Sequence, residues 1–287
     1  MGVLEASGSL AVANLPGEAE KLEASIGLLA RVGVRATMLT SQQANDALGG
    51  QGLGPALHQS IGGAVDPLAA RVALAARARA AGAKVVMSAL VERVDEDARG
   101  LWCVTRGGRL HARAVIHAGG VGSLAAEPWL RDRLDPVRSA VVQMGAPAGR
   151  FKLPWVSQNG FVSGRSRAAA GVLVTGCRWA SLEQGMGEVD EMGVDPGMFN
   201  ALRNFLDHFP DLIDAMVVGT WSSVTAYTCD GLPLVGPLPG RPRELVCLGF
   251  QGLDASLAMR AARAVADGLL TGSSPGWPAW LGPGRLT

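Results

Sequence analysis

Residues 230–272 carry the clearest pattern that could support chemistry: a Pro/Gly-rich turn, DGLPLVGPLPG, followed by RPRELVCLGFQG and LDASLAMRAARAVADGLLTG. The apolar run 244–250 predicts a short strand, and apolar residues at helical spacing predict a helix over 256–270. Gly249 and Gly252 break the chain between them. A strand, a glycine turn and a helix N-terminus direct unpaired backbone N–H groups toward one point. Such a point favours an anion or a polarised carbonyl group.

A few side chains outside this stretch are of types that suit substrate binding. Tyr227, the single tyrosine, could orient a substrate carboxylate or amine through its phenol, or it packs at a strand end. Arg165 could pair with a substrate carboxylate through two hydrogen bonds. Its neighbour Arg167 favours instead a solvated strand end. Trp179 and Trp221 could wall an amine pocket, although large aromatic residues in strands more often belong to the core.

The histidines and cysteines show no metal-binding or hydrolytic pattern. No two cysteines have C-x-x-C spacing and no His pair accompanies them, so we expect no metal ion. We expect reduced thiols, as in a cytoplasmic protein, at Cys103, Cys177, Cys229 and Cys247. His117 lies in an apolar run and is expected to be a core histidine whose ring is hydrogen-bonded. No G-x-S-x-G sequence is present, which argues against a hydrolase.

Length and charge limit the classes of partner. A chain of 287 residues can form one large domain or two modest ones. The formal net charge of +1 indicates neither nucleic acid nor an anionic membrane surface as a partner. The sequence contains no apolar run long enough to span a bilayer and no signal-peptide pattern at its first residues. We therefore expect a cytoplasmic location.

Turn residues and periodicity predict the elements that must position these groups. Thr40 and Asp66 are expected helix N-caps, and Gly82 follows the end of a helix. Helices are expected at 18–29, 41–48, 66–80, 196–208 and 256–270, with residues 49–64 as a loop. Strands are expected at 7–14, 34–39, 83–87, 90–95, 102–106, 109–112, 114–117 and 244–250. Four further strands, at 137–146, 156–165, 170–177 and 215–226, are expected to form one antiparallel sheet.

The C-terminal stretch resembles the flavin-contacting segment of the FAD-dependent D-amino acid oxidase family, which includes glycine, sarcosine and other amine oxidoreductases. In that family a D-G-x-P-x-x-G turn leads to a strand, a Gly-Phe-x-Gly turn and a helix that begins at the isoalloxazine. The matching residues are Asp230, Gly231, Pro233, Gly236, Gly249, Phe250 and Gly252. The family usually continues with His-Gly, where this chain has Leu253 and Asp254. A carboxylate at this place would repel an anionic reduced flavin.

The middle of the chain resembles the same family. A Val-Asp-Pro helix start, several strands and an Ala-x-Gly landmark follow in the family's order, but Gly122 stands at the landmark's usual aromatic position. The resemblance implies that Tyr227 and Arg165 act on the substrate. It implies FAD contacts from Val91, whose backbone would meet the adenine, and from Ala118, Gly119, Gly120, Gly231, Pro233, Gly249, Phe250, Gly252, Leu253, Asp254, Ala255 and Ser256.

The strand, G-x-G-x-x-G turn and helix with which the family begins have no counterpart in this sequence. Residues 120–125 fit G-x-G-x-x-A, but Pro128 interrupts the helix that such a motif should open, so we reject this match. Without that unit, a sheet should keep an open edge and an apolar face. The chain is then a fragment, the partner of a separate chain that supplies the ADP-binding unit, or a degenerate homologue.

Together these observations predict an α/β (α+β) protein, an incomplete FAD-binding Rossmann-like domain interleaved with an antiparallel-sheet substrate domain. We expect residues 1–60 and 126–226 in the substrate domain and residues 61–125 and 227–287 in the FAD-binding domain. The function implied is dehydrogenation of the C–N bond of an amino acid or secondary amine, with FAD as cofactor. The alternative is a non-catalytic remnant, fragment or subunit that cannot bind FAD alone.

Overall fold

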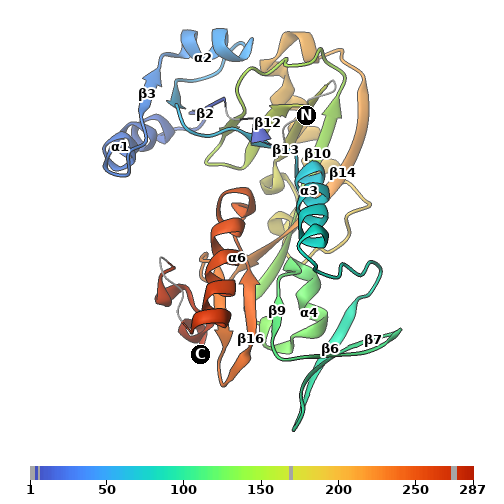
Figure 1. Ribbon diagram of the computed structural model, residues 1–287. Helices are drawn as coiled ribbons and strands as arrows, with labels where there is room; N and C mark the ends of the chain where they lie inside the picture. Colours follow the sequence, from blue (N-terminus) through green and yellow to red (C-terminus); the bar gives the residue numbers. More distant parts are fainter. Residues whose placement is uncertain (1–3, 6, 168–170, 273–276) are drawn as a thin grey trace. The chain divides into compact units, whose positions relative to one another are not determined.

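The computed structural model describes residues 4–5, 7–167, 171–272 and 277–287 and divides the chain into two compact units that alternate along the sequence (Figure 1). Unit 1 consists of Met1–Ala76, Arg138–Gly185 and Asp190–Ser223. Unit 2 consists of Arg77–Val137, Met186–Val189 and Val224–Thr287. The mixed α/β class agrees with the prediction from sequence.

Unit 1 is built on a sheet with the strand order β14-β10-β13-β12-β11-β2-β4-β3. Strands β2 and β11 pair in parallel, and the pairs β2–β4, β3–β4, β11–β12, β12–β13 and β10–β13 are antiparallel. The bounds are β2 Ser9–Val12, β3 Ala36–Leu39, β4 Ala56–Gln59, β10 Leu134–Met144, β11 Trp155–Ser157, β12 Val162–Ser166, β13 Val172–Gly176 and β14 Val217–Thr228. A short pair, β1 Leu4–Glu5 with β5 Ala64–Val65, lies in the same unit.

Aromatic packing holds the core of unit 1. Trp155 on β11 stacks against Phe205, with ring centroids 5.4 Å apart. The opposite strand residue, Gly164, leaves room for this indole, because a Cβ at that position would lie 2.3 Å from the ring. Phe205 ends helix α5, Pro196–Phe205, whose N-cap Asp195 accepts a hydrogen bond from the Met198 N–H. The other helices that begin in this unit are α1 Glu18–Arg31, α2 Ser41–Leu48 and α3 Pro67–Ala80.

Unit 2 contains a three-stranded sheet of β15 Leu234–Leu238, β16 Arg241–Leu248 and β9 Val115–His117, in that order. Strands β16 and β9 are parallel, and β15 and β16 are antiparallel. Helix α6, Asp254–Thr271, covers one face, where its Ala261 and Val265 pack with the buried side chains of β15 and β16. The opposite face packs on Leu130 and Leu134, close to the short helix α4, Ser123–Ala126.

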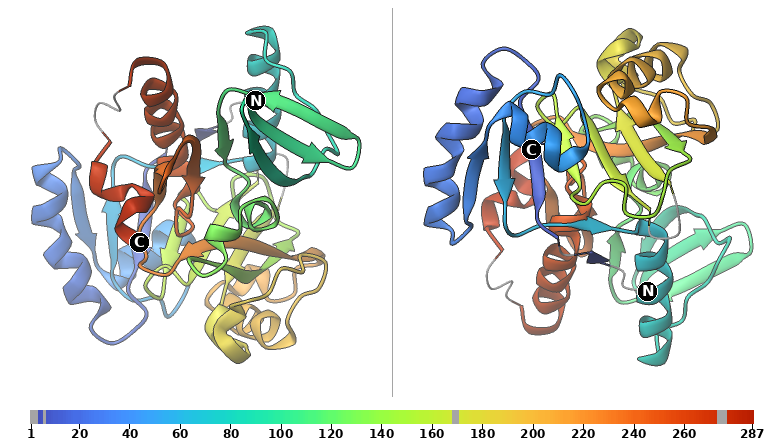
Figure 2. Two further views of the ribbon diagram at one scale, coloured as in Figure 1. Left: turned by 90° about the horizontal axis from the view of Figure 1, so that it is seen from below. Right: turned by 90° about the horizontal axis from the view of Figure 1, so that it is seen from above.

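A second small sheet of unit 2 consists of β6 Val91–Asp97, β7 Gly100–Thr105 and β8 Gly108–Ala112. All its pairs are antiparallel, and Figure 2 shows it in green from two further sides. Its hairpin turn lies at Arg106–Gly107, one residue before the Gly107–Gly108 turn expected from the sequence, because Gly108 already pairs with Thr105.

The predicted helices agree with the structure in position, but several strand predictions were wrong. Residues 83–87 form no strand, and Val86 and Met87 are 72% and 71% exposed, because no described strand lies beside them to pair with. The predicted loop 49–64 contains β4, which is stabilised by pairing with β2 and β3 on its two sides. Such pairing partners are distant in sequence, so local patterns do not reveal them.

Two further predictions were wrong in detail. The strand expected at 156–165 is two strands, β11 and β12, because Gln158, Asn159 and Gly160 all adopt positive φ and reverse the chain. The pairs β10–β13, β12–β13 and β11–β12 are antiparallel, as expected for these predicted strands, and β11 also pairs in parallel with β2. The Pro/Gly-rich stretch expected as a turn contains strand β15, in which Pro237 lies next to a β-bulge.

Candidate functional site

The turn between β16 and α6 is tight and is anchored in the core. Gly249, Gln251 and Gly252 have positive φ values of 71°, 57° and 79°. The Leu253 N–H donates to the Phe250 carbonyl over 2.8 Å, which closes the turn. Phe250 is 4% exposed and packs with the core side chains of β15, β16 and α6. Gly252 therefore presents main-chain atoms at the surface, while Gly249 is buried and Phe250 fixes the turn to the sheet.

Side chains from the end of β14 lie against this turn. A Cβ on Gly249 would lie 2.5 Å from Thr228 Cγ2, and a Cβ on Gly252 would lie 3.5 Å from the Tyr227 hydroxyl. The Gln251 amide donates to the Gly249 carbonyl over 3.1 Å and to the Thr228 hydroxyl. The Tyr227 phenol predicted to meet a substrate thus lies beside the glycine turn predicted to meet the flavin.

The N-terminus of α6 follows the turn directly. The Ser256 and Leu257 N–H groups both donate to the Leu253 carbonyl, over 3.0 Å. Within the described residues, the N–H groups of Asp254 and Ala255 have no acceptor, so they remain available to an external one. Asp254 adds a carboxylate to this first turn, which offsets part of the positive end of the helix dipole.

The D-G-x-P turn is held by the C-terminal segment. Arg285 donates to the Asp230 carboxylate with Nε over 2.6 Å and with Nη2 over 3.0 Å, and it also donates to the Leu232 carbonyl. This ion pair lowers the pKa of Asp230. Gly231 has a φ of 73°, and Pro233 is buried. Sequence reasoning did not predict that an arginine near the C-terminus binds the motif aspartate.

A cavity of about 370 Å³ brings together three other predicted cofactor residues. Val91 from β6 and Ala118 and Gly119 from the end of β9 line it. The Gly119 N–H donates to the Ser123 hydroxyl over 3.0 Å. Gly120 adopts a φ of 55°, and a Cβ there would have no neighbour within 4 Å. The cavity lining is mainly small and apolar, which suits a flat ring rather than a charged group.

The two groups of predicted cofactor residues follow neighbouring parallel strands. Residue His117 of β9 is opposite Val246 of β16, so the glycine turns that follow both strands leave the same edge of the sheet. Ligands of open α/β sheets bind at the carboxyl ends of parallel strands. The arrangement of small residues, positive φ glycines and available N–H groups at this edge fits a flat cofactor with a polar chain.

The far edge of β9 has no strand beside it in the described part of the chain. Ile116 on this strand is 43% exposed, and Leu90 in the segment before β6 is 62% exposed. The open edge expected from the sequence is thus confirmed for the residues that the structure describes, whereas the expected apolar face stays a prediction.

Arg165 and the two tryptophans lie in unit 1. Arg165 is on β12 opposite Leu173 of β13, and its Nη1 donates to the Ser166 carbonyl over 3.4 Å. Trp179 is 50% exposed and donates to the Gln158 side chain. Trp221 on β14 is 37% exposed. Their predicted roles toward a substrate stay predictions.

The chain matches a known protein family over most of its length. The family model "DAO: FAD dependent oxidoreductase" matches residues 2–268. The chain belongs to this family. The resemblance drawn from the glycine turns is thereby confirmed, and FAD is the cofactor of the family.

Individual relatives agree with this assignment. Glycine oxidase of Geobacillus kaustophilus (strain HTA426) is 28% identical over 200 residues, an alignment that covers 68% of this chain and 50% of the relative. The match thus spans about half the length of that curated relative. None of the helices in the described part of the chain has the length and apolar character needed to cross a membrane.

Solved structures show the same fold. The crystal structure of glycine oxidase from Geobacillus kaustophilus superposes with a TM-score of 0.85 at 24% identity, covering 98% of this chain and 75% of that one. The crystal structure of L-proline dehydrogenase from P. horikoshii gives a TM-score of 0.83 at 18% identity, covering 99% and 77%. Iminodiacetate oxidase from Chelativorans sp. BNC1 gives 0.76 at 17% identity, covering 98% and 76%.

Proposed function

We propose that this chain provides the flavin-contacting and substrate-binding parts of an FAD-dependent oxidoreductase that dehydrogenates the C–N bond of an amino acid or secondary amine. The observation that carries the proposal is the pair of glycine turns at the carboxyl ends of the parallel strands β9 and β16. Glycine oxidase, proline dehydrogenase and iminodiacetate oxidase, to which the chain is similar, are named for amino acids or secondary amines, which supports this substrate class.

Each group of residues has a distinct proposed role toward the cofactor. Val91, Ala118, Gly119 and Gly120 would hold the nucleotide end; the cavity that Val91, Ala118 and Gly119 line, and the open space beside Gly120, support this. The flavin end would be held by Gly231, Pro233, Gly249, Phe250, Gly252, Leu253, Asp254, Ala255 and Ser256. FAD, when bound, supplies the acceptor for the hydride that leaves the substrate carbon.

The substrate would be oriented by the protein's own polar side chains. The Tyr227 hydroxyl lies next to Gly252 and is proposed to bind the substrate amine or carboxylate. Arg165 is proposed to bind the carboxylate through its guanidinium group. Loss of a hydride from the carbon of the neutral amine leaves an iminium ion, which water hydrolyses to a carbonyl compound and an amine or ammonia, with release of a proton. Orientation alone supplies much of the rate in such a reaction.

The open edge of β9 favours a second candidate. A further strand pairing with this edge would cover the exposed Ile116 and Leu90 side chains and complete the nucleotide site. In that case the chain acts as a subunit or part of the enzyme, and a separate chain supplies the ADP-binding unit. Such a chain alone would not retain FAD. A cytoplasmic location stays a prediction from the sequence.

Anaerobic mixing of the FAD-loaded protein with glycine, sarcosine, L-proline, D-alanine and iminodiacetate tests the reaction. We expect at least one to bleach the flavin absorption and to yield the matching carbonyl product. Tyr227→Phe keeps the ring and removes the hydroxyl, and it should lower kcat/KM about tenfold or more, because a hydrogen bond to a charged substrate group is lost. If FAD binds but no amine bleaches it, the proposed reaction is wrong.

A further inference from the structure

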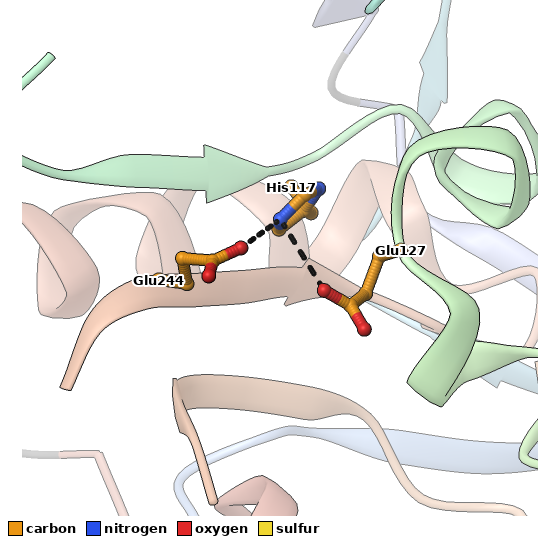
Figure 3. A group of neighbouring side chains, drawn as sticks. All are labelled: His117, Glu127 and Glu244. Atoms are coloured by element: carbon orange, nitrogen blue, oxygen red, sulfur yellow. Dashed lines mark hydrogen bonds and ion pairs between the residues drawn. The ribbon is translucent and has the colours of Figure 1, made fainter. Parts of the chain in front are cut away.

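A buried cluster of charged and polar side chains lies beside the cavity that Val91, Ala118 and Gly119 line. His117 Nε2 is 3.3 Å from Glu244 Oε2 and 3.9 Å from Glu127 Oε2 (Figure 3). The three side chains come from β9, β16 and the segment after α4, and they are 5%, 5% and 2% exposed. The sequence prediction of a core histidine with a hydrogen-bonded ring is confirmed, but its partners are distant in sequence and were not predicted.

Arg241 completes the cluster at the start of β16. It binds both Glu127 oxygens over 2.7 Å and reaches Glu244 Oε1 over 3.3 Å. Burial opposes ionisation of Glu127, but hydrogen bonds from Arg241 and the Trp129 N–H outweigh it and lower the pKa of this carboxyl group. His117 Nε2 is the ring atom within hydrogen-bonding distance of the Glu244 carboxyl group.

The same residues offer a metal ion three donor atoms within 4.8 Å of one another. However, Arg241 Nη1 lies within 3.3 Å of an oxygen of each carboxylate. A guanidinium group in this position already contacts both carboxyl groups and would repel a metal cation. The contacts therefore favour a cluster that links protein elements over a metal site.

The cluster lies at the end of β9, directly before the predicted cofactor residues Ala118 and Gly119. His117 is the last residue of β9, lines the cavity, and precedes Ala118 and Gly119, which line it too. Its partner Glu244 is on β16, the strand that leads to the Gly249 turn, and Glu127 follows α4, which begins with Ser123. The cluster thus ties together the elements that carry both glycine turns.

We propose that His117, through Glu244 and the Glu127–Arg241 pair, is a positioning residue that fixes the Ala118–Gly119 turn for the cofactor. This inference rests on the proposed function. His117 does not need to touch the cofactor's reacting atoms. Its role is to hold the end of β9 in register with β16, so that the cavity is formed before a ligand enters.

Hydrogen exchange without cofactor and FAD binding together test the proposal. His117→Ala and Glu244→Gln should speed exchange of amides 118–123 about tenfold or more and raise the Kd for FAD by a similar factor, because each leaves a buried polar partner unmatched. His117→Gln supplies a side-chain N–H and should restore both values to within about threefold. Glu92→Gln, the same change in an exposed ion pair with Arg106, is the matched control and should change neither.

Two results would decide against the proposal, and a third would separate it from the proposed function. Unchanged exchange and FAD affinity in folded His117→Ala and Glu244→Gln proteins would reduce the cluster to ordinary core packing. Zn²⁺ or Mn²⁺ that raises the Tm of the unmodified protein, but not of His117→Ala, would make the cluster a metal site instead. If the unmodified protein binds no FAD, the proposed function of the chain alone fails. The positioning role would still be supported if amides 118–123 exchange slowly in the unmodified protein and rapidly in His117→Ala.

Discussion

Replacing Gly249 by alanine should destabilise the protein more than replacing Gly231, although both residues have nearly the same backbone conformation. Their φ values are 71° and 73°, so both alanines incur a left-handed backbone cost of about 1–2 kcal/mol. A Cβ at Gly231 has no neighbour within 4 Å, whereas a Cβ at Gly249 would lie 2.5 Å from Thr228 Cγ2. Forcing an extra methyl group into a packed site adds about 1–3 kcal/mol.

The expected loss is therefore about 2–5 kcal/mol for Gly249→Ala and about 1–2 kcal/mol for Gly231→Ala. Urea unfolding followed by circular dichroism measures both. Thr228→Ser removes the clashing methyl group and keeps the hydroxyl that donates to the Leu232 carbonyl over 2.8 Å. Combined with Gly249→Ala, it should recover most of the difference. Equal stability of the two single variants, or no recovery in the double variant, would refute the steric reasoning.

Three further predictions concern charge, reactivity and capping. Hydrogen bonds from Arg285 lower the pKa of Asp230 in the folded state, so the ionised carboxylate stabilises the fold fully above the ordinary aspartate pKa of about 3.9. This contribution is lost as pH falls from that value through the lower pKa of the folded state, and Asp230→Asn should flatten the stability loss measured as pH falls below about 4. Burial raises the pKa of Cys177 to about 12, so a thiol reagent at neutral pH should label exposed Cys229 well before Cys177. Thr40→Ala removes the capping box of α2 and should lower the free energy of unfolding in urea by about 1 kcal/mol. An unchanged free energy of unfolding would contradict a capping role of the Thr40 side chain.

Local chemistry made the helices and turns predictable from sequence. Thr40 accepts the hydrogen bond from the Gln43 N–H that a capping residue should accept, and Asp66 caps α3 through the Leu68 and Ala69 N–H groups. These bonds join residues two or three positions apart, so a short stretch of sequence contains the whole interaction. The glycine turn after β16 was predictable for the same reason.

Long-range contacts account for what the sequence did not reveal. Strand β4 depends on pairing with β2 and β3, and residues 83–87 form no strand despite their apolar character. His117 meets Glu244, which lies 127 positions away, so no spacing rule marks the pair. The role of Arg285 in holding Asp230 was hidden likewise by their separation of 55 residues.

Flavin retention tests the central claim most directly, namely that the Gly249–Gly252 turn contacts the cofactor. The purified protein is mixed with FAD and desalted, and its visible spectrum is recorded beside those of Gly252→Ala and Gly272→Ala. Gly272 caps the other end of α6 with a similar φ of 75°, so its variant controls for backbone strain. We expect perturbed flavin bands that survive desalting in the unmodified and Gly272→Ala proteins and weaken in Gly252→Ala. Equal retention by both variants would contradict the account. Loss of all flavin from the unmodified protein would rule out FAD binding by the chain alone and leave the second candidate, in which a separate chain supplies the ADP-binding unit.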